Sequence, residues 1–369
     1  MDGRFRFGIE EEFFLADSTS RGTPRRTKPF HTAVRARVPT VERELFAAQV
    51  EVATAPTDSA DSARAQLAEL RTGLAETGRD HGILVLASGT QPVARWDRQL
   101  QTRKERYDRL MQQMQMLGRR NLVCGMHVHV EVPRPAERVD LMNRMLPFTP
   151  LLLALSASSP FWQGRDTGLA AYRLSVWGEM PRTGLPDLFD DAADYDRYVS
   201  AMIRSGAITD ASFLWWTLRP SIHFPTLELR VADSCTRLND TLGIAALYRC
   251  LVRLLDRSPA LNRGQTGAAR AITTENLWRA QRDGIRAEFL DVCGATVPFA
   301  AGLEAVLSQV EEDAAALGCE AELKWLRTVA AQGASADRQL AVFAAARGDA
   351  RQALLTTVDW IAATTAGTE

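Results

Sequence analysis

The chain of 369 residues contains very little lysine: only Lys28, Lys104 and Lys324 stand among its 44 basic residues. No lysine follows a glycine, so the Gly-Lys-Ser/Thr end of a phosphate-binding P-loop is excluded. None of the 24 glycines lies two positions from another, which excludes the Gly-x-Gly-x-x-Gly fingerprint of dinucleotide-binding and kinase loops. Any phosphate chemistry must therefore use a different kind of site.

Cysteine is also scarce, and apolar runs are short. The five cysteines are widely spaced without a Cys-x-x-Cys pair, so neither a disulfide framework nor a zinc cluster is indicated, and a reducing cytoplasm is the expected location. The acidic run Glu10–Glu12 near the N-terminus is unlike a secretory signal peptide. The longest apolar stretch, Leu151–Leu155, is bounded by prolines and too short for a bilayer, so we expect no membrane contact.

Two further absences narrow the function. No histidine is followed by glutamate and no Gly-x-Ser-x-Gly occurs, which excludes the usual signatures of zinc proteases and α/β-hydrolases. The 44 basic and 45 acidic residues give a formal charge of −1, and no basic stripe stands out along the chain. Nucleic acid is therefore not an expected partner.

Strand-like and helix-like segments alternate before a helical end of the chain. The predicted strands are Arg4–Leu15, Gln49–Ala53, Ile83–Ala87, Leu122–Val132, Phe213–Leu218 and Thr226–Val231. Apolar periodicity predicts helices over Asp58–Thr77 (with Thr57 or Asp58 as N-cap), Thr102–Leu117, Asp191–Ile203, Asp240–Leu255, Thr274–Leu290, Leu303–Leu317 and Ala336–Ala363. Loops are expected at Ser18–Pro29, Gly164–Pro186 and Ser258–Ala268. We expect a catalytic sheet core with covering helices over residues 1–260, and a helical region over 261–369 packed on the same domain.

Four of the predicted strands place glutamate or histidine between apolar residues. Residues two apart share a face of a strand, so the polar side chains of each strand point together, away from the apolar ones. The positions concerned are Glu10, Glu12, Glu51, His127, His129 and Glu228, and Arg230 shares the face of Glu228. For any single strand, a solvent-exposed face explains such a pattern.

For four strands together, a ligand site explains the pattern better. Carboxylates gathered on one face would repel one another and lose hydration, so a cation must offset their charge. Oxygen ligands with one imidazole suit magnesium or manganese, and magnesium commonly shares its shell with phosphates. We favour His127 as the imidazole ligand, with His129 second. The pattern thus indicates nucleotide chemistry without a P-loop.

Seven short motifs stand in order between residues 7 and 290. They are Phe7-Gly-Ile-Glu-Glu-Glu12, Glu44 with Val50-Glu-Val-Ala-Thr54, Ser88-Gly-Thr90 with Trp96, Glu105-Arg-Tyr107, Gly125-Met-His-Val-His-Val130, Trp216-Thr-Leu-Arg-Pro-Ser221 and Glu228-Leu-Arg-Val231. This ordered set resembles the type 2 glutamate-cysteine ligase family, or carboxylate-amine ligases, of the glutamine-synthetase-like superfamily. One motif departs: the family commonly has Gly-Thr-His-Pro where this chain has Gly89-Thr-Gln-Pro92.

The resemblance implies a fold and a reaction. The fold would be α+β, with a curved, mainly antiparallel sheet that forms an active-site funnel, surrounding helices and a helical C-terminal region. The reaction would be the ATP- and magnesium-dependent joining of a small-molecule acid, expected to be glutamate, to cysteine or another amine. The acid would be activated as an acyl phosphate, which the amine attacks to form an amide.

The resemblance also implies roles for individual residues. The metal ligands would be Glu10, Glu12, Glu44, Glu51, His127 and Glu228. Arg230 and Arg106 would act in catalysis on phosphate or carboxylate oxygens, and the nucleotide would contact Arg219, Arg230, Arg106 and Tyr107. Two alternatives remain: a metal-dependent amide hydrolase that activates water, and a non-catalytic homologue on the same fold. A homodimer is also left open.

Overall fold

The computed structural model describes residues 5–367, so the start of the predicted strand at Arg4 lies outside the described residues. A seven-stranded sheet forms its centre, in the order β10-β11-β5-β1-β3-β2, and β4 pairs with β1. Every pairing in this sheet is antiparallel. Its strands are β1 (Phe7–Asp17), β2 (Glu42–Arg43), β3 (Gln49–Ala53), β4 (Ile83–Leu86), β5 (Met126–Glu131), β10 (Leu218–Pro220) and β11 (Thr226–Leu229).

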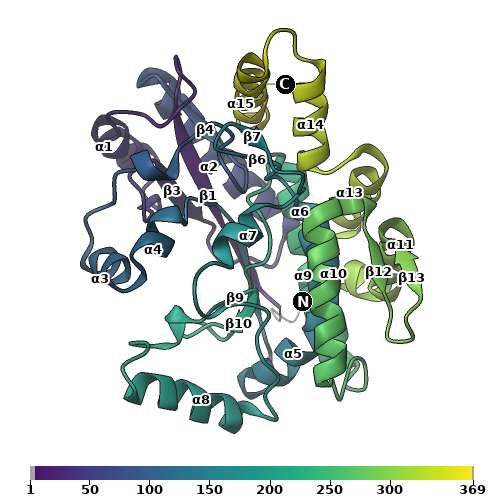
Figure 1. Ribbon diagram of the computed structural model, residues 1–369. Helices are drawn as coiled ribbons and strands as arrows, with labels where there is room; N and C mark the ends of the chain where they lie inside the picture. The colour runs from purple at the N-terminus through teal and green to yellow at the C-terminus, as the bar shows by residue number, and fades with distance from the viewer. Residues whose placement is uncertain (1–4, 368–369) are drawn as a thin grey trace.

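Helices surround this sheet, and the C-terminal region is helical, as Figure 1 shows. The helices are α1 (Lys28–Arg37), α2 (Ala60–Asp80), α3 (Glu105–Met114), α4 (Met116–Arg120), α5 (Arg138–Met145), α6 (Thr149–Ser156), α7 (Arg173–Trp177), α8 (Ala192–Arg204), α9 (Leu238–Arg257), α10 (Gly267–Asp283), α11 (Phe299–Gln309), α12 (Glu311–Leu317), α13 (Glu320–Gln332), α14 (Ser335–Ala345) and α15 (Ala350–Thr365). The predicted α+β class with a mainly antiparallel sheet is thereby confirmed. The boundary between residues 260 and 261 stays a prediction.

Three small two-stranded sheets complete the strands of the described residues. They pair β6 (Phe161–Trp162) with β7 (Arg165–Asp166), β8 (Thr183–Gly184) with β9 (Trp215–Trp216), and β12 (Glu288–Leu290) with β13 (Thr296–Pro298). The pairing of β8 with β9 is parallel. The predicted strand Phe213–Leu218 is therefore wrong as a single element, because β9 and β10 belong to different sheets.

Strand β1 has two chemically different faces. Phe7 and Ile9 lie on the face covered by α2 and α9, and both are buried. Glu11 lies on this covered face too, where its carboxylate accepts hydrogen bonds from the Arg71 guanidinium at 2.5 and 2.9 Å. The Thr241 hydroxyl of α9 donates a third, at 2.7 Å. This buried ion pair ties the middle of the sheet to the helices behind it, and Glu10 and Glu12 lie on the opposite face of β1.

Several predicted helix boundaries are wrong, each for a local reason. The predicted helix Thr274–Leu290 ends at Asp283, because Gly284 has a φ of +56° and starts a short turn before β12. The predicted helix Thr102–Leu117 is broken at Gln115, whose φ of +50° separates α3 from α4. The predicted helix Ala336–Ala363 is divided near Gly348, whose φ is +110°, into α14 and α15, which lie side by side at the top of Figure 1. The N-cap of α2 is Ser59, whose hydroxyl accepts from the amide of Ser62, and not Thr57 or Asp58.

The expected loop Gly164–Pro186 contains more structure than predicted. Helix α7 and strands β7 and β8 all lie within it, and Arg173, the first residue of α7, is buried. Among residues 5–367, no helix combines the length and the apolar composition that a bilayer-spanning segment needs.

Candidate active site

A cavity of about 380 Å³ opens over the part of the sheet that carries Glu10 and Glu12, and it brings together every site residue that the sequence predicts. These are Glu10, Glu12, Glu44, Glu51, Arg106, Tyr107, His127, Arg219, Glu228 and Arg230. They come from five strands, the position directly after β11, the turn after β2 and helix α3. Strand alternation alone accounts for the meeting of the sheet residues, since each occupies the same side of its strand.

The strand register sets which of these side chains are neighbours. Glu10 on β1 stands opposite His127 on β5, and Glu12 stands opposite Glu51 on β3. Glu228 on β11 stands opposite His129 on β5. Directly opposed residues have Cβ atoms about 5 Å apart, so the register places ligand-bearing side chains in contact across four adjacent strands.

The first ligand group consists of Glu10, His129 and Glu228, whose ligand atoms lie within 4.8 Å of one another. His129 Nε2 is 3.4 Å from Glu10 Oε1 and 4.0 Å from Glu228 Oε1. Its other nitrogen, Nδ1, is 3.0 Å from the hydroxyl of Thr226, which fixes the orientation of the ring. The sequence favoured His127 over His129 as the imidazole ligand, whereas this group contains His129.

His127 lies beside this group and contacts Glu10 directly. Its Nδ1 is 3.1 Å from Glu10 Oε2. Burial lowers the pKa of His127 to about 4, and the charge of Arg230 adds to this effect, so the ring is neutral at pH 7. A neutral ring that donates from Nδ1 to the carboxylate keeps the lone pair of Nε2 available as an acceptor or ligand. Burial opposes ionisation of Glu10, but hydrogen bonds from His127 and His129 outweigh it and lower the Glu10 pKa.

The second ligand group consists of Glu12, Glu44 and Glu51, again with ligand atoms within 4.8 Å of one another. Burial, followed by the charge of Glu44, raises the pKa of Glu12 to about 7. The same two causes raise the pKa of Glu51 well above its usual value. Among the residues described, no histidine belongs to this group. The backbone amide of Gly125 donates a hydrogen bond to Glu12 Oε2 at 2.6 Å. Three crowded carboxylates of this kind would be stabilised by a divalent cation.

Two arginines flank Glu228. Arg219 forms a two-point contact with its carboxylate at 2.7 and 3.2 Å, and Arg230 donates to Oε1 from Nη1. Burial opposes ionisation of Glu228, but the charges of Arg230 and Arg219 outweigh it and lower the Glu228 pKa. The Nε of Arg230 is buried without a hydrogen-bond partner among the described residues. The Arg230 side chain also lines the cavity.

Arg106 and Tyr107 reach the cavity from α3. The guanidinium of Arg106 lies over the ring of Phe213, 5.5 Å from the centroid, and its Nη2 is 3.5 Å from the Ser212 hydroxyl. The Tyr107 hydroxyl donates to the carbonyl of Arg43 at 3.2 Å. Unlike Arg219 and Arg230, the Arg106 side chain is exposed, so it is free to reorient toward a ligand.

Sequence reasoning missed Arg173, which also lines the cavity. Its guanidinium donates to the carbonyls of Arg230 and Val231, both at 3.2 Å, and lies over the ring of Trp177. A Cβ on Gly125 would overlap this guanidinium, so a larger residue there would displace it. The glycine before the His-x-His run was the available signal, because an isolated glycine in a strand pattern marks a close approach.

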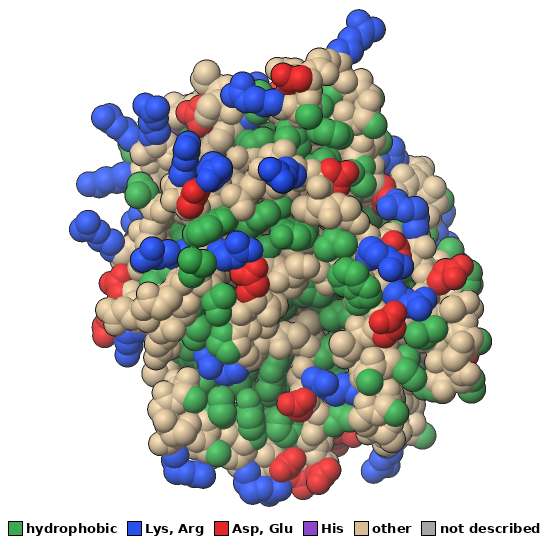
Figure 2. Space-filling model, viewed as in Figure 1, with side chains coloured by type: hydrophobic (Ala, Val, Ile, Leu, Met, Phe, Trp, Pro, Cys, Tyr) green, Lys and Arg blue, Asp and Glu red, His purple; other side chains and the backbone are tan. Residues whose placement is uncertain are grey.

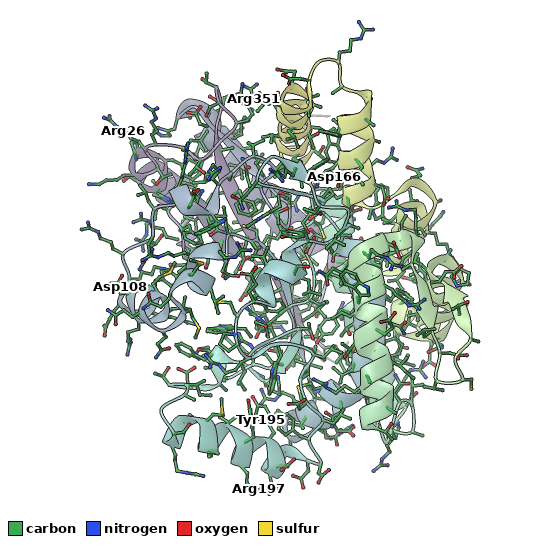
Figure 3. All side chains as sticks on the ribbon, in the orientation of Figure 1. Arg26, Asp108, Asp166, Tyr195, Arg197 and Arg351 are labelled. Carbon is green, nitrogen blue, oxygen red and sulfur yellow. The ribbon has the colours of Figure 1, made fainter. Side chains whose placement is uncertain are left out.

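The cavity also has an apolar wall that sequence reasoning did not identify. This wall consists of Trp177, Met180 and Trp215, which come from the segments around α7 and β9. Helix α8 packs behind this wall: Tyr195 contacts Trp216 and Phe189, with ring centroids 6.4 and 5.4 Å apart. Figure 3 shows Tyr195 on the inner side of α8 and Arg197 on its outer side.

Comparison with known proteins agrees with the resemblance that the sequence motifs indicate. The family model described as "Glutamate-cysteine ligase family 2" matches residues 6–356. The chain belongs to this family. Family 2 ligases of Bradyrhizobium diazoefficiens and Rhodospirillum rubrum, both named "Putative glutamate--cysteine ligase 2", are 43% identical to it. The alignments cover 98% of this chain, and 84% and 95% of the two relatives.

A solved structure shows that the fold is shared more widely. The glutamate–cysteine ligase of Francisella tularensis, in complex with AMP, superposes with a TM-score of 0.74 at 11% identity. The superposition covers 99% of this chain and 90% of that one. The predicted family is confirmed, and with it the assignment of the chain to the carboxylate-amine ligases, a class of enzymes.

Proposed function

We propose that this family 2 ligase uses ATP and magnesium to join the carboxylate of glutamate to cysteine or another small amine through an acyl phosphate. The observation that carries the proposal is the pair of ligand groups on adjacent positions of one face: Glu10 belongs to one and Glu12 to the other. Two such groups can hold cations within reach of the same chain of phosphates. The names of the relatives support glutamate and cysteine as the substrates. The expected cytoplasmic location is part of the same proposal.

The chemistry of the donor set fits magnesium, with manganese as an alternative. Carboxylate oxygens dominate both groups, and at most one imidazole joins each. Glu10, Glu228 and His129, with His127 adjacent, would hold one ion, and Glu12, Glu44 and Glu51 another. When bound, such ions neutralise phosphate charge and align the reacting oxygens.

The residues of the chain supply the remaining positioning. Arg230 is held by Glu228 and lines the cavity, so it would stabilise charge that develops on the transferred phosphoryl group. Arg219, also held by Glu228, would contact the nucleotide phosphates. Arg106 and Tyr107 on α3, which also line the cavity, would contact the bound substrates. No side-chain nucleophile is needed in this scheme.

The proposed reaction proceeds in two steps. An oxygen of the substrate carboxylate attacks the γ-phosphorus of ATP, and ADP leaves. The amine nitrogen then attacks the acyl carbon and loses a proton, and inorganic phosphate leaves with the former carboxylate oxygen. The neutral amine must be free to attack, and the apolar wall of Trp177, Met180 and Trp215 limits its hydration.

Oxygen labelling tests the proposal directly. Glutamate labelled with ¹⁸O in its side-chain carboxylate, incubated with ATP, magnesium and cysteine, should deliver one label to the released phosphate for each amide formed. A metal-dependent hydrolase would make no such transfer and would need no ATP. Label confined to the amide during productive turnover would eliminate the acyl phosphate, and ADP release independent of any amine would argue against a ligase.

A further inference from the structure

A second cleft, of about 1060 Å³, lies on the far side of β2 from the active-site cavity. It is bordered by segments 20–29, 43–48 and 93–103. Six basic side chains with exposed positions line it: Arg25, Arg26, Lys28, Arg43, Arg98 and Arg103. Figure 2 shows Lys and Arg side chains projecting along the upper left edge of the molecule, and Figure 3 labels Arg26 there.

The basic cleft carries a surplus of positive charge. Within residues 5–367, none of the six side chains forms an ion pair or a hydrogen bond, and no aspartate or glutamate lines the cleft. The seventh basic residue of the lining, Arg95, is paired with Asp97 at 2.7 Å. Elsewhere on this chain arginines are commonly paired, and its formal charge is only −1. Several positive charges that line a concave surface concentrate the electrostatic field there and favour an anionic ligand.

The floor of the cleft distinguishes between kinds of anion. It is aliphatic: Leu100 is 66% exposed, and Val93 and Pro24 also line the cleft. Among residues 5–367, no aromatic side chain lines the cleft, whereas proteins that bind nucleotides or single-stranded nucleic acids commonly stack the bases on aromatic rings. Guanidinium groups match carboxylates in a two-point geometry, and an aliphatic floor suits the methylenes of glutamate side chains.

We propose that the basic cleft binds a carboxylate-rich peptide segment, so that the protein recruits an acidic protein or peptide partner. The cleft is much larger than the active-site cavity and exceeds what a single amino acid needs. The two sites share a wall. Arg43 lines the cleft, its neighbours Glu42 and Glu44 line the cavity, and Lys104 and Tyr107 donate to the Arg43 carbonyl at 2.9 and 3.2 Å. This inference does not depend on the proposed reaction.

Binding of fluorescein-labelled octaglutamate to the full chain, followed by fluorescence anisotropy at low salt, tests the proposal. The triple variant Arg25→Gln/Arg26→Gln/Arg98→Gln should bind the peptide roughly tenfold more weakly. The matched control Arg204→Gln/Arg347→Gln/Arg351→Gln removes the same charge from exposed arginines outside the cleft, and it should weaken binding by no more than about twofold. A second pair of variants leaves the arginines intact: Leu100→Glu should weaken binding, and Val292→Glu, at an exposed position elsewhere, should not.

Three results would overturn the proposal. Octaglutamate that binds no more tightly than octaglutamine would show that carboxylates are not recognised. An equal loss in the two triple variants would show that only the overall charge matters. An oligothymidylate of equal charge that binds more tightly than octaglutamate would identify the cleft as a nucleic-acid site.

Discussion

Three consecutive glutamates of β1 have three different environments. Glu10 lies between two histidines, whose hydrogen bonds outweigh burial and lower its pKa, whereas burial, followed by the charge of Glu44, raises the pKa of Glu12 to about 7. Glu11 points to the opposite face and is buried against Arg71. The crowding of carboxylates that the sequence suggested therefore applies to Glu12 and Glu51, while Glu10 and Glu228 are compensated by neighbouring His and Arg side chains.

The raised pKa of Glu12 predicts how the stability of the metal-free protein depends on pH. A carboxyl group whose pKa is higher in the folded state than its usual 4.5 binds its proton more tightly there, so stability falls as pH rises from 4.5 through 7. A shift to about 7 corresponds to roughly 3 kcal/mol of unfolding free energy. Glu12→Gln should flatten this decline in urea titrations between pH 5 and 8, whereas Glu105→Gln on the surface of α3 should not. Parallel profiles for wild type and Glu12→Gln would contradict the crowding.

Arg230 is predicted to act on the transition state more than on binding. Arg230→Lys keeps the charge but loses the planar fork that contacts both Glu228 and the cavity. We expect kcat to fall by roughly 10²-fold, a typical effect of removing one preorganised donor, while the KM for ATP changes only a few-fold. Steady-state kinetics test this, with Arg134→Lys in an exposed ion pair as the control. A rise in KM at constant kcat would assign Arg230 to binding instead.

At the scale of elements, β1 is tied to α2 by the Glu11–Arg71 pair. Glu11→Gln leaves a buried guanidinium without its counter-charge, so we expect the unfolding free energy to fall by about 3 kcal/mol. The double variant Glu11→Leu/Arg71→Met removes both charges and should recover more than half of that loss. Urea unfolding of the two variants measures the difference. A double variant less stable than Glu11→Gln would show that the hydrogen bonds from Arg71 to the carbonyls of Cys235 and Thr236 matter more than the charge pairing.

The alternating strands could be predicted from the sequence, and several helices could not. The predicted β3 is confirmed residue for residue, and β1 and β5 lie within or close to their predicted ranges, because one buried and one polar face give a period of two. Helix α6 escaped prediction because all eight of its residues are buried, which leaves no polar face to reveal a period. The breaks at Gln115 and Gly284 depend on positive φ angles, and Gln115 carries no sequence signal for one.

Part of the candidate site could likewise be predicted from the sequence, and part could not. Its strand residues could be identified because the period of two places them on one face before any register is known. The ranking of His127 over His129 could not be settled from the sequence, since both share that face and only the pairing of β5 with β11 brings His129 to Glu228. Arg173 and Trp215 reach the cavity from segments whose path depends on tertiary packing. The basic cleft was also hidden, because its arginines come from three separate segments.

At the scale of the whole molecule, ATP and magnesium are predicted to bind interdependently. Carboxylates alone hold magnesium loosely, and phosphate oxygens complete the shell, so each ligand should raise the affinity for the other. The increase in melting temperature with both ligands should exceed the sum of the separate increases. Glu51→Gln should reduce this excess while the variant stays folded without metal. Calorimetry that finds equal ATP affinities with and without magnesium would refute the shared shell.

The two faces of β1 also restrict how the length of the chain can vary. Inserting or deleting one residue between Phe7 and Glu12 would exchange the faces, so that ligand carboxylates would enter the core and Phe or Ile side chains would enter the cavity. Relatives that differ in length in this region should therefore carry their insertions and deletions after Asp17, where β1 ends in a turn, or before Phe7. In an alignment of the family, the strands that hold the ligand residues should therefore be the ones without gaps.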